Sequence, residues 1–420
     1  MPAQKAKYAD IFTGYNTAIA GITGNSIHVW SASAAHSYPL STNITLTLHI
    51  FNPDLHLKEE KKVELGEINS WSMDFQYADT CYYASISCVS YVNKRLLLKI
   101  DQHGNVSDVS DTPALWTKVI LTDEKDRFYA VNRKNNHLFS VATENAMIRD
   151  SSGDKNIVLL PGENLTPGQV VQELIVKKED ITTRESVQLI FGSLVKKFYN
   201  PVIIATDTAI LVSASAESNI ANNDLFIFFA RLDTNLSGPR IRPVIFKSKK
   251  IKNEIYPPSG IIQSENRVVL VSKGLSKQET VKYSPEYQNG ITVQVPHQSG
   301  RYFTNSLKIT MIDEKNNSLK DTIITSQGRN KNLQWDNLLT LVSGKGIEIF
   351  CSRKYAANKN GITHFSMNEE GRIKEEDMIV DTRYDYLVAE AKGLGKGTVL
   401  IPFLYKGKRG LVKLEYQPVE

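Results

Sequence analysis

Five aspartates lie close to aromatic residues in three short stretches, WSMDFQYAD (71–79), QWDN (334–337) and DTRYDY (381–386). Two carboxyl groups can hydrolyse a glycosidic bond when they lie about 5–10 Å apart and one of them keeps its proton at neutral pH. Acids in such stretches can equally cap a loop or accept a hydrogen bond from a backbone amide, and this is the role that we expect. The candidate acids, if the protein is an enzyme, are Asp74, Asp336, Asp381 and Asp385.

Few other patterns point to chemistry. The chain contains no P-loop, GxSxG, HExxH or EF-hand spacing, and no two of its eight histidines have the spacing of metal ligands on a helix. KGLGKG (392–397) is rich in glycine, but a phosphate-binding loop of this kind needs a helix after it. Because KGLGKG lies between two strand-like runs, it predicts a hairpin turn. The three cysteines, Cys81, Cys88 and Cys351, are too few for a disulfide scaffold and have no CxxC spacing. We therefore expect no cofactor and no metal site.

Aromatic residues form a second candidate set, because exposed Trp and Tyr side chains anchor peptides and stack on sugar faces. One such residue, or a proline, precedes each successive strand pair, and the segment 276–302 adds further tyrosines. A residue that recurs once per repeat usually serves the packing of the repeat, so burial between sheets is the alternative role. The candidate ligand-binding residues are Trp71, Trp116, Trp335, Tyr384, Tyr386, Tyr283 and Tyr287.

Strand-like runs dominate the chain. Examples are ITLTLHIF (44–51), DLFIFFARL (224–232) and TVLIPFLY (398–405), which are short, rich in β-branched and aromatic residues, and bounded by turn formers. The best helical pattern is GQVVQELIVKKEDI (168–181), which predicts a helix after Pro167. The composition of the remaining runs predicts an all-β fold.

A polar residue opens a tight turn after many of these runs. An Asx side chain at such a position can accept a hydrogen bond from the backbone two residues further on. Each copy therefore predicts a hairpin between two antiparallel strands. The copies begin at Asn52, Asp101, Asp233, Asp313 and Asn368, with a weaker one at Thr143.

Through these repeated turns and the aromatic residues that precede each strand pair, the chain resembles β-propeller proteins over nearly its whole length, at the level of the superfold. A repeat of about 40–50 residues with four strands is a propeller blade. The resemblance implies one domain over 1–420 with seven four-stranded antiparallel blades. Residues 151–198 are then either an insert or a degenerate eighth blade, and 276–302 is a loop insertion within a blade. Because the last blade lacks an outer strand, AKYADIFTG (6–14) is expected to supply it, so that pairing of the N- and C-terminal strands closes the ring.

A superfold hosts many unrelated functions, so function must be sought in a site. We expect a non-catalytic binding or scaffold module that recognises a protein or a glycan through the loop face around the central channel. The alternative is a propeller glycoside hydrolase or lyase that uses a carboxylate pair near the channel mouth.

Charge and hydropathy exclude some partners. The net charge of +5, from 50 basic and 45 acidic residues, is too weak an excess to indicate nucleic-acid binding. No run reaches the ~18 apolar residues that span a bilayer. Met1-Pro2-Ala3 before Gln4 resembles the end of a signal sequence, so we favour an exported protein with a trimmed leader over a cytoplasmic one. The sequence gives no indication of oligomeric state.

Overall fold

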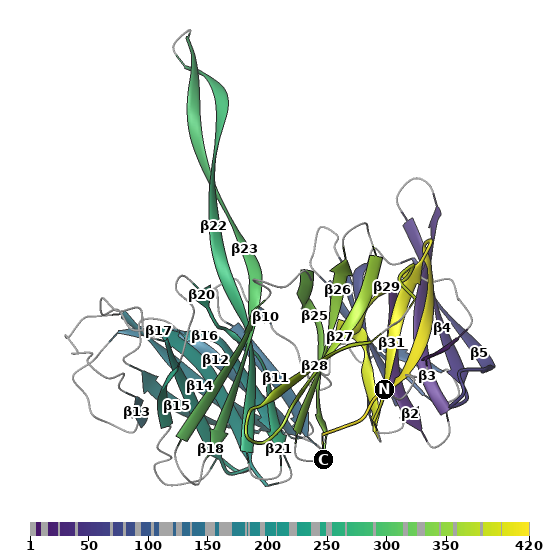
Figure 1. The fold of residues 1–420 in the computed structure, drawn as a ribbon, viewed down its shortest axis with the longest axis horizontal. Coiled ribbons are helices and arrows are strands. Elements are labelled where there is room, and N and C mark those ends of the chain that lie inside the picture. The colour runs from purple at the N-terminus through teal and green to yellow at the C-terminus, as the bar shows by residue number, and fades with distance from the viewer. Residues whose placement is uncertain are drawn as a thin grey trace. The chain divides into compact units, whose positions relative to one another are not determined.

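The fold is that of a computed structural model of the chain (Figure 1). Among the described residues the only helical segment is a 3₁₀ helix, η2 (Val388–Glu390), and strands make up most of the rest, so the all-β prediction is confirmed. The structure describes residues 6–9, 16–23, 26–37, 41–67, 70–78, 81–88, 94–101, 105–108, 121–122, 128–134, 137–147, 156–158, 170–180, 183, 185–193, 198–206, 208–217, 225–236, 244–248, 254–264, 267–288, 291–313, 318–325, 332–343, 346–355, 359–378, 381–395 and 397–419.

The chain divides into two compact units. Unit 1 comprises Met1–Leu115 and Arg329–Glu420, and unit 2 comprises Trp116–Gly328. The described strands form seven sheets, which we number 1 to 7 in chain order. All strand pairs in them are antiparallel except one parallel pair in sheet 3.

Unit 1 contains sheets 1, 2, 6 and 7. Sheet 1 consists of β2 (Asn16–Thr23), β3 (Ser26–Ser37), β4 (Ser41–Phe51) and β5 (Leu57–Glu67). Sheet 2 consists of β6 (Ser70–Ala78), β7 (Cys81–Cys88), β8 (Lys94–Ile100) and β9 (Val106–Asp108). Sheet 6 consists of β25 (Asn332–Ser343), β26 (Gly346–Tyr355), β27 (Lys359–Met367) and β28 (Ile373–Met378). Sheet 7 consists of β29 (Asp385–Tyr386), β30 (Lys392–Gly395), β31 (Thr398–Tyr405), β32 (Lys408–Glu415) and β1 (Ala6–Tyr8).

Unit 2 contains sheets 3, 4 and 5. Sheet 3 consists of β10 (Leu121–Thr122), β11 (Phe128–Lys134), β12 (His137–Met147), β13 (Asn156–Val158), β14 (Val170–Asp180) and β15 (Ser186–Ser193). Sheet 4 consists of β16 (Phe198–Ala205), β17 (Ile210–Glu217), β18 (Leu225–Leu232) and β19 (Val244–Ser248). Sheet 5 consists of β20 (Glu254–Ile255), β21 (Pro258–Ser264), β22 (Arg267–Gln288), β23 (Ile291–Asp313) and β24 (Ser318–Thr325).

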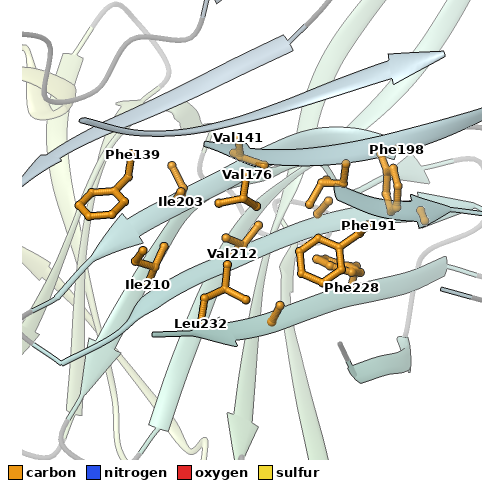
Figure 2. Packing of buried hydrophobic residues seen from close by; sticks show 14 of the residues in the cluster. Phe139, Val141, Val176, Phe191, Phe198, Ile203, Ile210, Val212, Phe228 and Leu232 are labelled. Carbon is orange, nitrogen blue, oxygen red and sulfur yellow. The ribbon is translucent and has the colours of Figure 1, made fainter. Parts of the chain in front are cut away.

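Within each unit, shared apolar clusters pack several sheets face to face. Strand β18 shows the consequence, because Phe228 lies in the apolar cluster shared with sheet 3 (Figure 2) and Phe229 in the cluster shared with sheet 5. A strand covered on both faces reads as a continuous hydrophobic run, which explains the lack of alternation in LFIFFARL. In unit 1, equivalent clusters join sheet 6 to sheet 7 and sheet 7 to sheet 1.

The N-terminal strand β1 pairs antiparallel with β32, the last strand of the chain. The register places Ala6 opposite Leu414 and Tyr8 opposite Val412, and the amide of Ala9 donates to the carbonyl of Leu411 at 2.8 Å. The predicted pairing of the two terminal strands in one sheet is therefore present. Lys7 adds an ion pair with Asp54 on the β4–β5 turn of sheet 1, at 2.6 Å.

Asx turns connect strands at most of the predicted positions. The Asn52 side chain accepts from the amide of His56 at 2.8 Å, and the Asp101 side chain accepts from the amide of Asn105 at 2.9 Å. Equivalent hydrogen bonds follow Asp233 and Asn368. Asp313 ends β23, and the residues that follow it, 314–317, lie outside the described part of the chain.

The predicted turn at Thr143 is wrong. Thr143 lies inside β12, opposite Leu174 of β14. The Asx turn of sheet 3 begins instead at Asp180, whose side chain accepts from the amide of Thr183 at 2.9 Å and whose own amide donates to the carbonyl of Glu185 at 2.9 Å. This turn in the sequence, KKEDITTRES (177–186), overlaps the stretch 168–181, whose apolar pattern predicts a helix.

The predicted helix over 168–181 is also wrong, since Val170–Asp180 is strand β14. Leu174 and Val176 are fully buried two positions apart, and β14 pairs with both β12 and β15. Packing against sheet 4 overrides the local helical pattern. The described strands of 151–198 join sheet 3, where β14 supplies its next strand, and do not form a sheet of their own.

The segment 276–302 is part of a long two-stranded ribbon, not a loop. Strands β22 and β23 continue beyond sheet 5 as a paired hairpin, which stands out from the rest of unit 2 in Figure 1. Their flanking strands β20 and β24 pair with them only as far as Ser276 and Ser306. Beyond these points the register runs on to Gln288 opposite Ile291.

Candidate functional site

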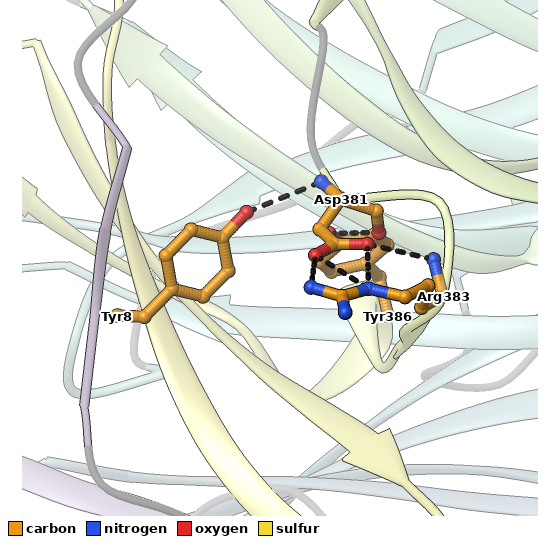
Figure 3. A network of polar contacts seen from close by, with 4 residues as sticks. All are labelled: Tyr8, Asp381, Arg383 and Tyr386. Carbon is orange, nitrogen blue, oxygen red and sulfur yellow. Dashed lines mark hydrogen bonds and ion pairs between the residues drawn. The ribbon is translucent and has the colours of Figure 1, made fainter.

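The loop before β29 is held by Asp381. Its side chain accepts a hydrogen bond from the amide of Arg383 at 3.0 Å, which makes an Asx turn. Its carbonyl accepts from the Tyr386 hydroxyl at 2.7 Å, and its amide donates to the Tyr8 hydroxyl at 3.2 Å (Figure 3). Asn337 of β25 ties down the end of the loop, because its side chain donates to the Tyr386 carbonyl at 2.7 Å. The loop therefore presents its side chains from a fixed backbone.

Asp381 and Arg383 form an ion pair at the surface. The Arg383 Nε lies 2.9 Å from each carboxylate oxygen of Asp381, and Nη2 donates to the same carboxylate. These hydrogen bonds hold the pKa of Asp381 below its ordinary value, which burial partly opposes. The Arg383 side chain is 66% exposed. The carboxylate thus orients the guanidinium through Nε and Nη2, and Nη1 takes no part in the ion pair.

Aromatic rings line the same end of sheet 7. The Tyr384 ring stacks on Phe403 of β31 with centroids 4.2 Å apart, and Phe403 lies 5.9 Å from the ring of Tyr8. Tyr8 also lies 5.6 Å from Tyr384. Gly410 permits this row, because a Cβ atom at that position would lie 2.5 Å from Cζ of Phe403. Tyr8, at the outer strand, stays 40% exposed.

Cations flank these rings. The guanidinium carbon of Arg383 lies 5.7 Å from the ring centroid of Tyr384 and 6.0 Å from that of Tyr405. Lys406 Nζ lies 5.3 Å from the Tyr405 ring. Such contacts hold a cation in place at modest energetic gain. We call Tyr8, Arg383, Tyr384, Tyr405 and Lys406 the tyrosine–arginine surface.

The turn between β31 and β32 positions Lys406. Tyr405 pairs with Lys408, and the two residues between them have positive φ, 49° for Lys406 and 77° for Gly407. Two such residues form a type I′ turn, whose twist matches that of the strands. Lys406 and Lys408 are exposed, and no acidic group lies within 4 Å of either among the described residues.

The sequence candidates are distributed as follows. Tyr384 belongs to the tyrosine–arginine surface, and Asp381 orients its arginine. Trp335 and Tyr386 are 1% and 2% exposed, so their rings pack in the core and are not available to a ligand. Asp385 is exposed and accepts from the side chain of Asn360.

Other candidates lie wholly or partly outside the described part of the chain. The backbone places Trp71 and Asp74 in β6, Asp336 in β25, and Tyr283 and Tyr287 in β22, where the side chains are not described. Trp116 lies outside the described residues altogether.

Sequence reasoning missed Tyr8, Arg383, Tyr405 and Lys406. Two signals were available. Tyr8 lies in the segment that was expected to complete the last sheet, and Arg383 lies between Asp381 and Tyr384 in DTRYDY. The combination needed the strand pairing, because Tyr8 and Tyr384 are far apart in the sequence.

A second polar cluster lies in sheet 1. The Ser31 hydroxyl is 2.8 Å from Nε2 of His49, and Nδ1 of His49 is 2.9 Å from the carboxylate of Glu60. This connectivity is that of a nucleophile, a base and an orienting acid. Ser31 and His49 are only 2% and 3% exposed, and they share a sheet face with apolar residues packed on sheet 7. A nucleophile must be reached by its substrate, so we assign this cluster to packing.

Unit 2 contains a buried network between sheets 4 and 5. Lys308 lies 3.6 Å from Asp321, which also accepts from Ser248 at 2.9 Å and Thr310 at 2.6 Å. Burial lowers the pKa of Lys308 to about 8, although Asp321 opposes the shift. Because both charged side chains are 1% exposed, the network joins β19 to sheet 5 and offers nothing to a ligand.

Neither a metal site nor a membrane-spanning helix finds support in the described residues. No cluster of three or more His, Cys, Asp or Glu side chains there has the arrangement of a metal site. No helix among these residues is long and apolar enough to cross a membrane.

Comparison with known proteins identifies no family. No protein-family profile matches the chain, and no curated protein matches it. Three similar solved structures are the polysaccharide lyase Uly1 (9% identity, 98% of each chain, TM-score 0.44), the Pyrococcus horikoshii acylaminoacyl peptidase (11%, 95% of this chain and 49% of that one, 0.38) and the WD40 domain of SCAP from fission yeast (8%, 98% of each, 0.29). Identities and TM-scores this low assign neither a family nor an activity to the chain.

Proposed function

We propose that the seven sheets are the blades of a β-propeller and that the pairing of β1 with β32 closes its ring. Support comes from within the two units. The first or second strands of successive sheets lie against each other, as β2 against β6, and β16 against both β11 and β21. In unit 2, sheet 4 packs face to face with sheets 3 and 5. In unit 1, sheet 7 packs on sheets 6 and 1 and is completed from the other end of the chain.

We further propose that the protein is a non-catalytic binding module that recognises a glycan or a protein through the tyrosine–arginine surface. The supporting observation is the placement of Arg383, which is held by Asp381 and lies beside the rings of Tyr384 and Tyr405 while staying largely exposed. An oriented, solvent-facing guanidinium among aromatic rings is typical of recognition sites.

The alternative function, a glycoside hydrolase or lyase, receives less support from Asp381 and Asp385, the two candidate acids whose side chains the structure describes. A glycosidase needs one carboxyl group with a raised pKa. Arg383 instead lowers the pKa of Asp381, so this carboxylate is ionised at neutral pH and orients a cation. Asp385 is engaged by Asn360.

A paired glycan and peptide array tests the binding proposal. The wild-type chain should bind a subset of ligands, and Tyr8→Ser should lose most of that signal, because the exposed ring is removed without opening the core. Leu57→Ser is the matched control, since Leu57 is 41% exposed and lies on β5 of the same unit. Equal binding of all three proteins, or no binding by any, would refute the proposal.

A further inference from the structure

We propose that the ligand of the tyrosine–arginine surface is an acidic polysaccharide, one whose sugar units carry carboxylate or sulfate groups. This inference rests on the proposed binding function and specifies its ligand class. It is carried by the charges of the surface, by their geometry, and by the mixture of donors and acceptors around them.

The cations of this surface are available to an anion. Lys406 and Lys408 have no acidic partner within 4 Å in the described part of the chain, and both are exposed. Arg383 is paired with Asp381, yet the pair uses Nε and Nη2, which leaves the Nη1 edge for a second acceptor. Arg383 and Lys406 both lie against the Tyr405 ring. Anionic groups on one sugar or on two adjacent sugars can therefore contact both cations.

The rest of the surface favours a sugar over an acidic peptide. The exposed ring of Tyr8 offers a face on which a sugar ring can stack. The Asp381 carboxylate beside Arg383 is 24% exposed and can accept hydrogen bonds only. A sugar acid supplies an anionic group for the cations and hydroxyl donors for this carboxylate. An acidic peptide could offer this carboxylate only its backbone N–H groups, because its acidic side chains supply acceptors alone, whereas a sugar carries several hydroxyl donors beside each anionic group.

The test uses the full chain and four polymers: polygalacturonate, dextran sulfate, neutral dextran and poly-L-glutamate. The wild type should bind one or both of the acidic polysaccharides at least about tenfold more tightly than the other two polymers. A Lys406→Gln/Lys408→Gln variant should lose about tenfold in affinity, because it removes two exposed charges that the anionic groups would contact. Preference for polygalacturonate or for dextran sulfate would show whether carboxylate or sulfate is the recognised group.

A Lys58→Gln/Lys374→Gln variant is the matched control, since it removes two exposed lysines elsewhere in unit 1. It should bind as the wild type does, whereas an equal loss would show that only the net charge matters and would overturn the proposal. Equal binding of poly-L-glutamate, or of neutral dextran, would overturn the acidic-polysaccharide assignment and leave the binding module standing. Binding to none of the four polymers would overturn the ligand class, and the array with Tyr8→Ser would then decide the binding function separately.

Discussion

The hydroxyl oxygen of Ser31 lies 2.8 Å from Nε2 of His49 on the neighbouring strand of sheet 1, and both groups are buried. Burial lowers the pKa of His49, and nearby Lys62 lowers it further, whereas Glu60 raises it by charge and by hydrogen bond. The imidazole is thus held neutral inside the sheet. A buried neutral histidine couples folding to pH.

The first prediction follows from this lowered pKa. An unfolded His49 titrates near 6.5, above the folded value, so between the two values the unfolded chain binds more protons. Stability should therefore be constant above about pH 7.5 and fall as the pH drops through 6.5, with a slope of at most about 1.4 kcal/mol per pH unit for this one proton. Urea unfolding at pH 7.5, 6.5 and 5.5 measures the slope.

His49→Gln should flatten that dependence, because glutamine does not titrate. Some slope will remain, since the pKa of His28 is also lowered by burial and by Lys61. His56→Gln is the control, because His56 is exposed at the β4–β5 turn. An unchanged slope in His49→Gln would show that the Ser31–His49–Glu60 cluster does not carry the effect.

The second prediction concerns the glycine beneath the aromatic row. A Cβ at Gly410 would lie 2.5 Å from the Phe403 ring, so Gly410→Ala must displace that ring and its contacts with Tyr8 and Tyr384. We expect a loss of ~1–3 kcal/mol in the free energy of unfolding. Chemical denaturation measures it.

Gly260→Ala provides the comparison, because nothing lies within 4 Å of a Cβ there and its φ is not positive. This change should be neutral or should stabilise the chain by up to about 1 kcal/mol, through the entropy of the unfolded state. Equal effects of the two substitutions would contradict the packing described for Phe403.

Local sequence signals predicted much of this fold, and their failures have a physical cause. Asn52, Asp101, Asp233 and Asn368 open real hairpin turns because an Asx turn is a local interaction within a few residues. Strand β14 was misread because its helical period is also local, while its pairing with β12 and β15 is not. Whether this segment forms a helix or a strand depends on its pairing with strands that lie outside any short window of the sequence.

The candidate site shows the same division. Asp381 and Tyr384 could be singled out because they lie in one short polar and aromatic stretch. Tyr8 joins them only through the pairing of β1 with β32, and Tyr405 only through the turn before β32. The burial of Trp335 and Tyr386 agrees with the packing alternative, and Tyr386 lies in the apolar cluster that joins sheets 6 and 7.

The third prediction tests whether strand β1 assembles the site. Ala9 is buried among the apolar residues that join sheet 7 to sheet 1. Ala9→Asp would bury an unpaired charge, so β1 should detach, which removes Tyr8 from the surface. Hydrogen exchange measured by mass spectrometry should show loss of protection over residues 6–9 and over β32.

The same variant should lose ligand binding to the extent that Tyr8→Ser does, while the hydrogen-exchange protection of the buried strand β18 in unit 2 stays unchanged. Ser107→Asp, an exposed position on β9 of the same unit, is the control for the added charge. Protection of β32 that survives in Ala9→Asp would mean that β1 is not what covers its edge.

The fourth prediction concerns the edges of the β22–β23 ribbon. Gln288 pairs with Ile291 across a two-residue connection, and hydrogen-bonded and non-hydrogen-bonded pairs alternate from there. Counting back, Pro285 (opposite Gln294) and Pro296 (opposite Tyr283) both fall in non-hydrogen-bonded pairs. In such a pair the backbone N–H groups point away from the partner strand. The two prolines, which have no N–H, therefore remove no hydrogen bond between β22 and β23, but each removes one donor from the outer edge of its strand. Proline on an exposed edge hinders pairing with another chain.

Pro285→Val/Pro296→Val should restore a donor to each edge and promote self-association through strand addition. Light scattering against concentration should show a larger apparent mass for the double variant than for the wild type, with unchanged far-ultraviolet circular dichroism. Ser284→Val/Val295→Thr is the matched control, because these two residues face each other in the adjacent pair and keep both edges as they are. Self-association of the control to the same degree would attribute the effect to added β-propensity. A response confined to the proline variant would show that the two prolines protect an arm with which no other described strand pairs beyond sheet 5.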